Sequence, residues 1–242
     1  MQFWITLLVA MAPAMILLGY IYWKDRLRRE PVKKILGAFG MGVLSVFLSL
    51  TITSLYHLPE AQNFRQMVQE NFFNAAMPEE IAKFIMFWLF VRWNKYFDER
   101  MDGIVYASCV ALGFAGLENC FYLFNNSDSL ISVGVTRSLL SVPGHFFDGV
   151  LMGYFYSRVH FDGASKINFL FMLGVPILLH GTFNSLIDLV KVPKPHLLGL
   201  IALLLPVIFI WLVSRVSRKS MDRHLEADAV MLAEAESAVA DD

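Results

Sequence analysis

Charged residues are scarce in this chain, and that scarcity narrows the class of protein. Only 17% of the 242 residues are Asp, Glu, Lys or Arg, whereas 57% are hydrophobic. A soluble domain carries about 25% charged residues, so this composition favours a membrane protein. The formal net charge of −1 provides no basic field for DNA or RNA, which excludes nucleic acid as the expected partner.

Cysteine is also nearly absent. The two cysteines, Cys109 and Cys120, fall within one apolar stretch and cannot form a disulfide framework, so we expect them to pack as small apolar residues. The sequence also lacks a His-Glu-x-x-His motif, an internal repeat and a low-complexity linker. Neither a disulfide scaffold nor a repeat architecture is therefore expected.

Long apolar stretches are what the chain has in abundance. A helix needs about 20 residues to cross the ~30 Å hydrocarbon core of a bilayer. The pattern predicts an all-α, polytopic transmembrane helical bundle with about seven spans. The expected spans are about 3–23, 35–56, 72–91, 103–124, 135–157, 167–190 and 196–214.

The basic residues predict how these spans are oriented. If the N-terminus is outside, fifteen of the 20 Lys and Arg residues fall on the inside and three on the outside. This bias follows the positive-inside rule and predicts an outside N-terminus and an inside C-terminus. The first basic cluster follows the first span, so we expect that span to be retained as an anchor.

The chain is expected to divide into a transmembrane domain, residues 1–219, and an acidic cytoplasmic tail, residues 220–242. The tail intersperses Asp and Glu with alanines, a pattern that indicates a solvated or partly disordered helix. His224 lies in this tail and is expected to be solvated. The chemistry is therefore expected within residues 1–219.

Four polar clusters interrupt the apolar stretches. They are Glu79-Glu80 with Lys83, Glu118 with Asn119, His145, and His180 with Asn184. A charge in hydrocarbon costs about 3 kcal/mol on the mildest scale, so such groups normally face a cavity and have a function. At 1.5 Å per residue, all four clusters fall at a similar depth in the outer half of the bilayer. This convergence predicts one shared site.

Spacing within the clusters suggests roles for their members. Lys83 follows the two glutamates by three and four residues, so its ammonium can reach either carboxylate on one helix face. If it holds one glutamate ionised, the other is a candidate general base. Asn119 adjoins Glu118, and Asn184 follows His180 by four residues, so both amides can orient those groups or stabilise an oxyanion.

Each polar group also has a purely structural interpretation. A lone histidine within a membrane is more often a hydrogen-bonded core residue than a catalyst, and a Glu–Lys pair can serve packing alone. Arg137, near the outer end of its span, is taken as structural. Gly149 and Gly153 form a G-x-x-x-G step that predicts close helix packing. Only the convergence of the four clusters favours a functional site.

At these clusters the chain resembles the PrsW-type intramembrane proteases. The matching segments are E-E-I-A-K at 79–83, G-F-A-G-L-E-N at 113–119, H-F-F-D-G at 145–149 and H-G-T-F-N at 180–184. The resemblance implies a multi-pass protein of the cell (inner) membrane that cleaves a single-span membrane protein near its extracytoplasmic side. The implied partners are the lipid bilayer and an anti-sigma factor, cut at site 1 in stress signalling.

The PrsW-type family resembles in turn the CAAX prenyl proteases and their bacterial Abi relatives. In those enzymes a double glutamate and a histidine activate water, and a His-x-x-x-Asn step holds the oxyanion. The resemblance implies that Glu79 or Glu80 is the general base, and that His180 and Asn184 stabilise the tetrahedral intermediate.

One motif departs from that pattern. The relatives' Phe-x-x-x-His step is here Phe114-x-x-x-Glu118, so His145 is the candidate for the missing histidine. The expected catalytic residues are Glu79, Glu80, Glu118, His145 and His180, supported by Lys83, Asn119 and Asn184.

Two alternatives stay open at the level of the sequence. Glu118, His145 and His180 would suit a divalent metal such as zinc with one open position, so the peptidase is either glutamate- or metal-dependent. Intramembrane carboxylates and histidines also build proton or cation pathways, which makes a coupled transporter the main rival. A non-catalytic membrane scaffold is the third possibility. Cleavage of a membrane substrate separates the first function from the other two.

Overall fold

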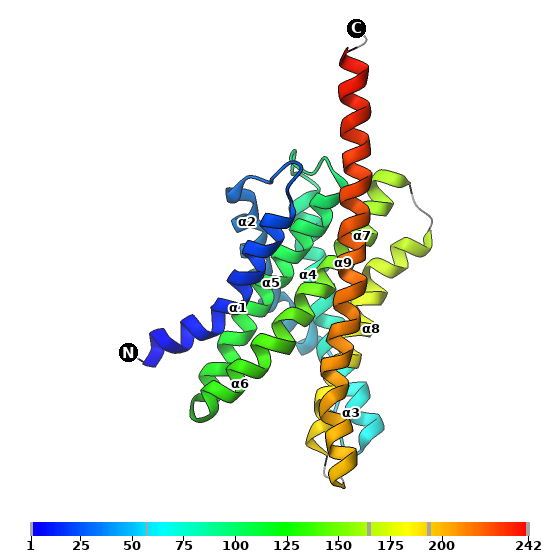
Figure 1. Ribbon diagram of the computed structural model, residues 1–242. Coiled ribbons are helices and arrows are strands. Elements are labelled where there is room, and N and C mark those ends of the chain that lie inside the picture. Colours follow the sequence, from blue (N-terminus) through cyan, green and yellow to red (C-terminus); the bar gives the residue numbers. More distant parts are fainter. Residues whose placement is uncertain (1, 57, 164–165, 193–194, 241–242) are drawn as a thin grey trace.

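The computed structural model describes residues 2–56, 58–163, 166–192 and 195–240. Within these ranges the chain is helical and contains no strand (Figure 1). The elements are α1 (Gln2–Lys24), α2 (Val32–Leu55), α3 (Phe64–Glu70), η1 (Asn71–Ala76), α4 (Met77–Val91), α5 (Arg100–Asn125), η2 (Ser127–Ser129), α6 (Leu130–Thr136), η3 (Arg137–Ser141), α7 (Val142–Asp162), α8 (Lys166–Lys191) and α9 (His196–Ala240).

Five of these helices, α1, α2, α5, α8 and α9, are long and apolar enough to cross a membrane. The expected all-helical membrane fold is therefore confirmed, although this number is lower than the seven spans predicted. The other two stretches, 72–91 and 135–157, correspond to η1–α4 and η3–α7. The helix α4 has only 15 residues, and both stretches carry the charged side chains of the polar clusters.

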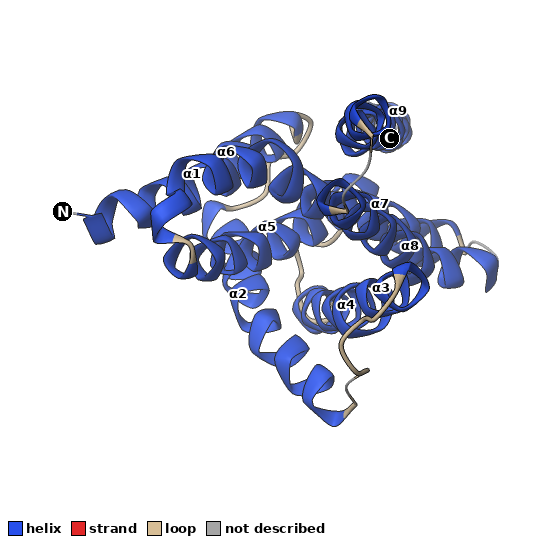
Figure 2. Cartoon of the chain, turned by 90° about the horizontal axis from the view of Figure 1, so that it is seen from below, coloured by secondary structure: helices blue, strands red, loops and turns tan. Residues whose placement is uncertain are grey.

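The helix α5 forms the core of the bundle, packed against α1, α2 and α7 (Figure 2). Glycines permit the close approach. A Cβ on Gly113 would lie 2.0 Å from the carbonyl oxygen of Phe39 in α2. A Cβ on Gly153 in α7 would lie 2.1 Å from the carbonyl oxygen of Gly103. The predicted close packing at Gly149 and Gly153 is confirmed, and it fixes α7 against α5.

A π-helical turn precedes α4, which carries Glu79 and Glu80, and another precedes α7, which carries His145. The N–H of Met77 donates to the carbonyl of Phe72, and that of Val142 to Arg137, each five residues back. Pro78 and Pro143 follow directly and have no N–H to donate, which disfavours regular α-helical pairing there. π-Turns rotate the side chains that follow them and are frequent at functional sites.

The helix α9 runs without a break through the expected domain boundary. Met221, His224 and Asp228 are buried, so the expectation that this part is solvated is wrong. The physical reason is that the Asp228 carboxylate accepts hydrogen bonds from the N–H groups of Arg100 (3.0 Å) and Met101 (2.8 Å). Those N–H groups lie in the first turn of α5 and have no partner within their own helix. Only the last turns of α9 extend beyond the bundle (Figure 1).

Candidate active site

Lys83 lies at the centre of a buried network that joins α4, α7 and α8. Its ammonium donates to Oε1 of Glu80 at 2.5 Å and lies 3.1 Å from Nδ1 of His145. The same Oε1 lies 2.7 Å from Nδ1 of His180. Lys83 and Glu80 are almost completely buried, so these charge-assisted bonds hold three helices in a fixed arrangement.

These partners assign the roles of three imidazole nitrogens. An ammonium group can only donate, so His145 accepts at Nδ1 and carries its proton on Nε2. A carboxylate can only accept, so His180 donates from Nδ1 to Glu80. The other ring nitrogen of His180, Nε2, lies 3.7 Å from Oε2 of Glu79. Nε2 of His180 and a carboxylate oxygen of Glu79 therefore face each other.

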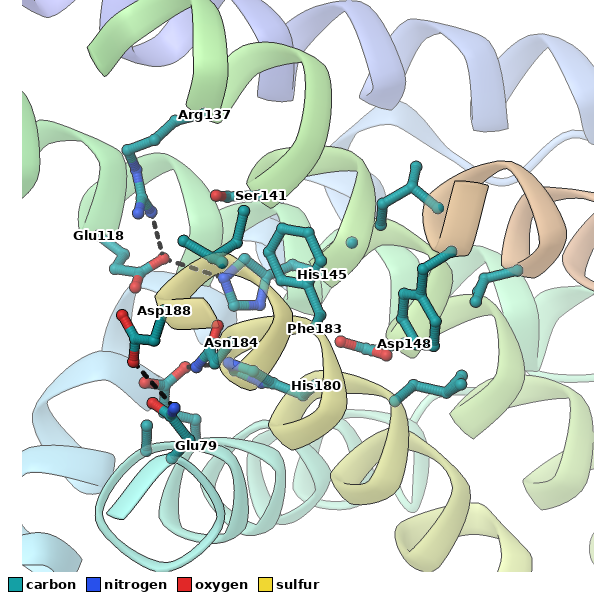
Figure 3. Close-up of a pocket in the computed structure, with 18 of the residues that line it drawn as sticks. Glu79, Glu118, Arg137, Ser141, His145, Asp148, His180, Phe183, Asn184 and Asp188 are labelled. Atoms are coloured by element: carbon teal, nitrogen blue, oxygen red, sulfur yellow. Dashed lines mark hydrogen bonds and ion pairs between the residues drawn. The ribbon is translucent and has the colours of Figure 1, made fainter. Parts of the chain in front are cut away.

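A second network lies on the other side of His145. Oε2 of Glu118 accepts from Nε2 of His145 at 2.9 Å and from Nη2 of Arg137 at 2.7 Å (Figure 3). Nε of Arg137 donates to Oδ1 of Asn119 at 2.8 Å, and the Asn119 amide donates to the carbonyl of Ala10, also at 2.8 Å. Asn119 thus orients Arg137, and its side chain makes no hydrogen bond to Glu118 among the described residues.

A cavity of about 350 Å³ lies beside the two networks. Its walls include Glu79, Glu118, His145, His180 and Asn184, and Figure 3 shows these side chains gathered around one space. The four clusters predicted to share a depth in the membrane therefore do come together. The chemical roles given to them stay predictions.

Four further charged residues line this cavity, namely Arg137, Asp148, Asp188 and Lys191. Asp148 follows His145 by three residues and is buried. Its position on the same helix face as His145 is a signal that the sequence did contain. Arg137, taken as structural, instead pairs with Glu118 at the cavity wall. The sequence around Arg137 does not indicate this role, because its partner Glu118 comes from a different helix, α5.

Among the residues that the structure describes, two groups of side chains have ligand atoms close enough to share a metal ion. They are Glu80, His145, Asp148 and His180 in one group, and Glu79, Glu118 and His145 in the other, with the atoms of each group within 4.8 Å of one another. The sequence predicted a different set of metal ligands, namely Glu118, His145 and His180. Among the described residues these three do not form one group. The physical reason is that Glu118 bonds to one side of His145, while His180 is held on the other side by Glu80.

The second group fits a metal better than the first. Within the first, the Lys83 ammonium contacts both Glu80 and His145 and supplies a positive charge, whereas within the second its printed hydrogen bond is to His145. Oε2 of Glu79 and Oε2 of Glu80 are both buried without a hydrogen-bond partner in the described part of the chain, but of the two residues only Glu79 lines the cavity. A buried carboxylate oxygen without a partner is unfavourable. A cation in the cavity beside Glu79 would relieve that cost.

Comparison with known proteins identifies the family. Residues 30–213 match the family described as PrsW family intramembrane metalloprotease. The chain belongs to the PrsW family. The resemblance carried by the four polar motifs is thereby confirmed, and the protein is an intramembrane peptidase rather than a transporter or a scaffold.

Three relatives, each named Protease PrsW, illustrate the similarity. The Clostridioides difficile protein is 32% identical over 212 residues, which cover 86% of this chain and 87% of the relative. The Oceanobacillus iheyensis protein is 35% identical over 199 residues, 79% of this chain and 90% of the relative. The Geobacillus kaustophilus protein is 36% identical over 197 residues, 80% and 84% respectively. No solved structure matches this PrsW-family chain significantly.

Proposed function

We propose that this chain cleaves a single-span membrane protein near the extracytoplasmic face of the cell (inner) membrane. The observation that carries the proposal is the polar cavity within a helical membrane bundle, where Glu79 faces Nε2 of His180. The bias of basic residues supports a multi-pass topology with the N-terminus outside. The resemblance in the four motifs supports an anti-sigma factor as substrate, cut at site 1 in stress signalling.

In this proposal Glu79 is the general base. Glu79 lines the cavity, whereas Glu80 is fully buried and its Oε1 is occupied by Lys83 and His180. A water molecule between Glu79 and His180 would transfer a proton to Glu79 as its oxygen attacks the peptide carbonyl carbon. Glu79 would then pass this proton to the leaving amine as the C–N bond breaks.

The remaining polar residues would orient the catalytic side chains and stabilise the tetrahedral intermediate. Glu80 fixes the ring of His180 through the Nδ1 hydrogen bond and so directs Nε2 into the cavity. Asn184 also lines the cavity, and its amide would donate to the oxyanion of the tetrahedral intermediate. Arg137 and His145 both donate hydrogen bonds to Glu118, and these bonds fix Glu118 in the cavity wall.

A divalent metal would be held by Glu118, His145 and one carboxylate oxygen of Glu79, with His180 adjacent. The other oxygen of Glu79 would remain the base, and metal binding would release the proton from Nε2 of His145. We propose zinc, because three nitrogen and oxygen ligands with one open position are typical of catalytic zinc sites. Such an ion, when bound, activates water and polarises the carbonyl. The metalloprotease description of the family and the buried, unpaired oxygen of Glu79 support this assignment.

The proposal is tested by reconstituting the purified chain with a panel of single-span membrane proteins that includes anti-sigma factors. Wild type and the exposed control Glu60→Gln should cleave a panel member, while Glu79→Gln and His180→Ala should not. Loss of cleavage with a chelator and its recovery with zinc would support the metal. Equal cleavage by all four proteins would contradict the assigned site, and insensitivity to the chelator would contradict the metal.

A further inference from the structure

An apolar groove lies beside the active-site cavity, at the edge of the bundle. It has a volume of about 860 Å³ and is bounded by η3, α7, the end of α8 and the first half of α9. We call it the lateral groove and define it by Leu139, Phe147, Leu203, Leu204, Val207 and Ile210. Figure 2 shows α9 standing beside the other helices rather than among them.

The lateral groove is continuous with the cavity. Ile187 of α8 and Ile210 of α9 line both spaces. Ile210 also lies against Gly144, since a Cβ built on that glycine would be 3.6 Å from Cδ1 of Ile210. Gly144 directly precedes His145. A chain segment in the groove would therefore reach the polar residues of the site by passing Ile187 and Ile210.

The wall formed by α9 is packed much less tightly at one end than at the other. Leu203 and Leu204 near its start are 56% and 54% exposed, whereas Val213 and Met221 further along are buried. Pro206 lies inside the helix between these parts and removes one backbone hydrogen bond. The C-terminal half of α9 thus packs into the core through Met221 and Leu225, whereas within residues 197–210 only Ala202 and Pro206 are buried.

We propose that the lateral groove receives the transmembrane helix of the substrate, which enters sideways from the lipid between α9 and η3–α7. This rests on the proposed function in taking a single-span membrane protein as the substrate. The groove volume corresponds to about two turns of an α-helix with its side chains. Its apolar walls match a membrane-spanning segment, and its opening onto the cavity places the end of that segment beside Glu79 and His180.

A matched pair of leucines on α9 allows a direct test of occupancy. Leu204 borders the groove, whereas Leu212 is similarly exposed, at 51%, and does not line it. The photo-reactive residue benzoylphenylalanine is placed at either position in the Glu79→Gln chain, which is reconstituted in phospholipid vesicles. The probe is a synthetic single-span peptide with an apolar helix of about 20 residues.

Cross-linking of the peptide at position 204 should exceed that at 212 by about fivefold or more and should fall when unlabelled peptide is added in excess. Equal cross-linking at the two positions, or a signal at 204 that unlabelled peptide does not reduce, would mean that the groove only contacts lipid. Either result would overturn the proposal. Because the chain is inactive, this readout does not depend on cleavage.

A second test compares substrates with and without a span. Leu204→Trp fills the groove and should lower kcat/KM for a single-span substrate about tenfold, but leave hydrolysis of a soluble peptide with the same scissile bond unchanged. Leu212→Trp should change neither. An equal loss on both substrates would overturn the proposal. If wild type cleaves nothing while position 204 still cross-links, the proposed function fails and the groove assignment stands.

Discussion

Two sets of buried ionisable side chains lie at opposite ends of α5, and they differ in how their charges are compensated. At the active site, Lys83 pairs with Glu80, and Arg137 pairs with Glu118, around a cavity. At the other end of α5, several buried carboxylates lie close together with few Lys or Arg side chains beside them. We call this set the acidic cluster, which comprises Asp25, Glu30, Glu99, Asp102 and Asp228, all buried.

The acidic cluster is held by helix ends and shared protons rather than by opposite charges. Burial raises the pKa of Asp25 to about 6 and the pKa values of Glu30 and Glu99 to about 7. Tyr106 of α5 donates a hydrogen bond to Glu30, and Asp228 accepts from the start of α5. The comparison teaches that burial of ionisable groups alone does not mark an active site. Paired charges around a cavity do.

The largest effect is expected at the free carboxylate. Glu79→Gln should lower kcat/KM by about 10²–10⁴-fold, the usual contribution of a general base, because the amide cannot accept the proton from water. The unfolding temperature should stay within about a degree of wild type, since Oε2 of Glu79 makes no hydrogen bond to the described residues. A variant that keeps wild-type activity would show that Glu79 is not the base.

The next largest effect concerns the central cation of the site. Lys83→Met leaves the fully buried Glu80 carboxylate without its main counter-charge, which should lower the free energy of unfolding by about 3–5 kcal/mol. Thermal unfolding in detergent measures the loss. The double variant Lys83→Met with Glu80→Gln should recover most of this stability but not the activity. Failure of the second change to restore stability would mean that the lysine acts by packing alone.

The contacts across the site could be predicted because a helix has a fixed rise per residue. Counting from the ends of the spans placed Glu118, His145 and His180 at one depth, and the hydrogen bonds of His145 and His180 follow from that placement. The same count could not choose between Glu79 and Glu80. That choice depends on which carboxylate faces the cavity, and the π-turn before α4 changes the direction in which the two side chains point.

Other features depend on contacts that no local pattern encodes. Arg137 pairs with Glu118, which lies on a different helix. Likewise, the acidic residues after position 220 look solvated in sequence. Asp228 is buried because the first turn of α5 needs an acceptor there.

Removal of the Asp228 carboxylate is expected to have a smaller effect, and that effect is on stability. Asp228→Ala removes both hydrogen bonds to the first turn of α5 and should cost about 1–2 kcal/mol of unfolding free energy, like the loss of a helix cap. Asp222→Ala is the matched control, because Asp222 is 54% exposed and pairs only with Lys24, so its loss should cost less than about 1 kcal/mol. Both variants should retain the wild-type kcat/KM, in contrast to Glu79→Gln. A large loss of activity in Asp228→Ala alone would couple the acidic cluster to catalysis.

The smallest effect tests whether the acidic cluster titrates. Burial raises the pKa of Glu99 from 4.5 to about 7, so the folded chain keeps a proton that the unfolded chain releases between these values. The stabilisation is complete below pH ~4.5 and is lost as the pH rises through ~7. The unfolding temperature of wild type should therefore fall between pH 5 and 8. Glu99→Gln has no titrating carboxyl group at position 99. The fall in its unfolding temperature between pH 5 and 8 should therefore be about 2 °C smaller than that of wild type. Parallel pH profiles for the two proteins would show that Glu99 is already ionised in the folded chain, and the contrast between the two ends of α5 would then lie in the cavity alone.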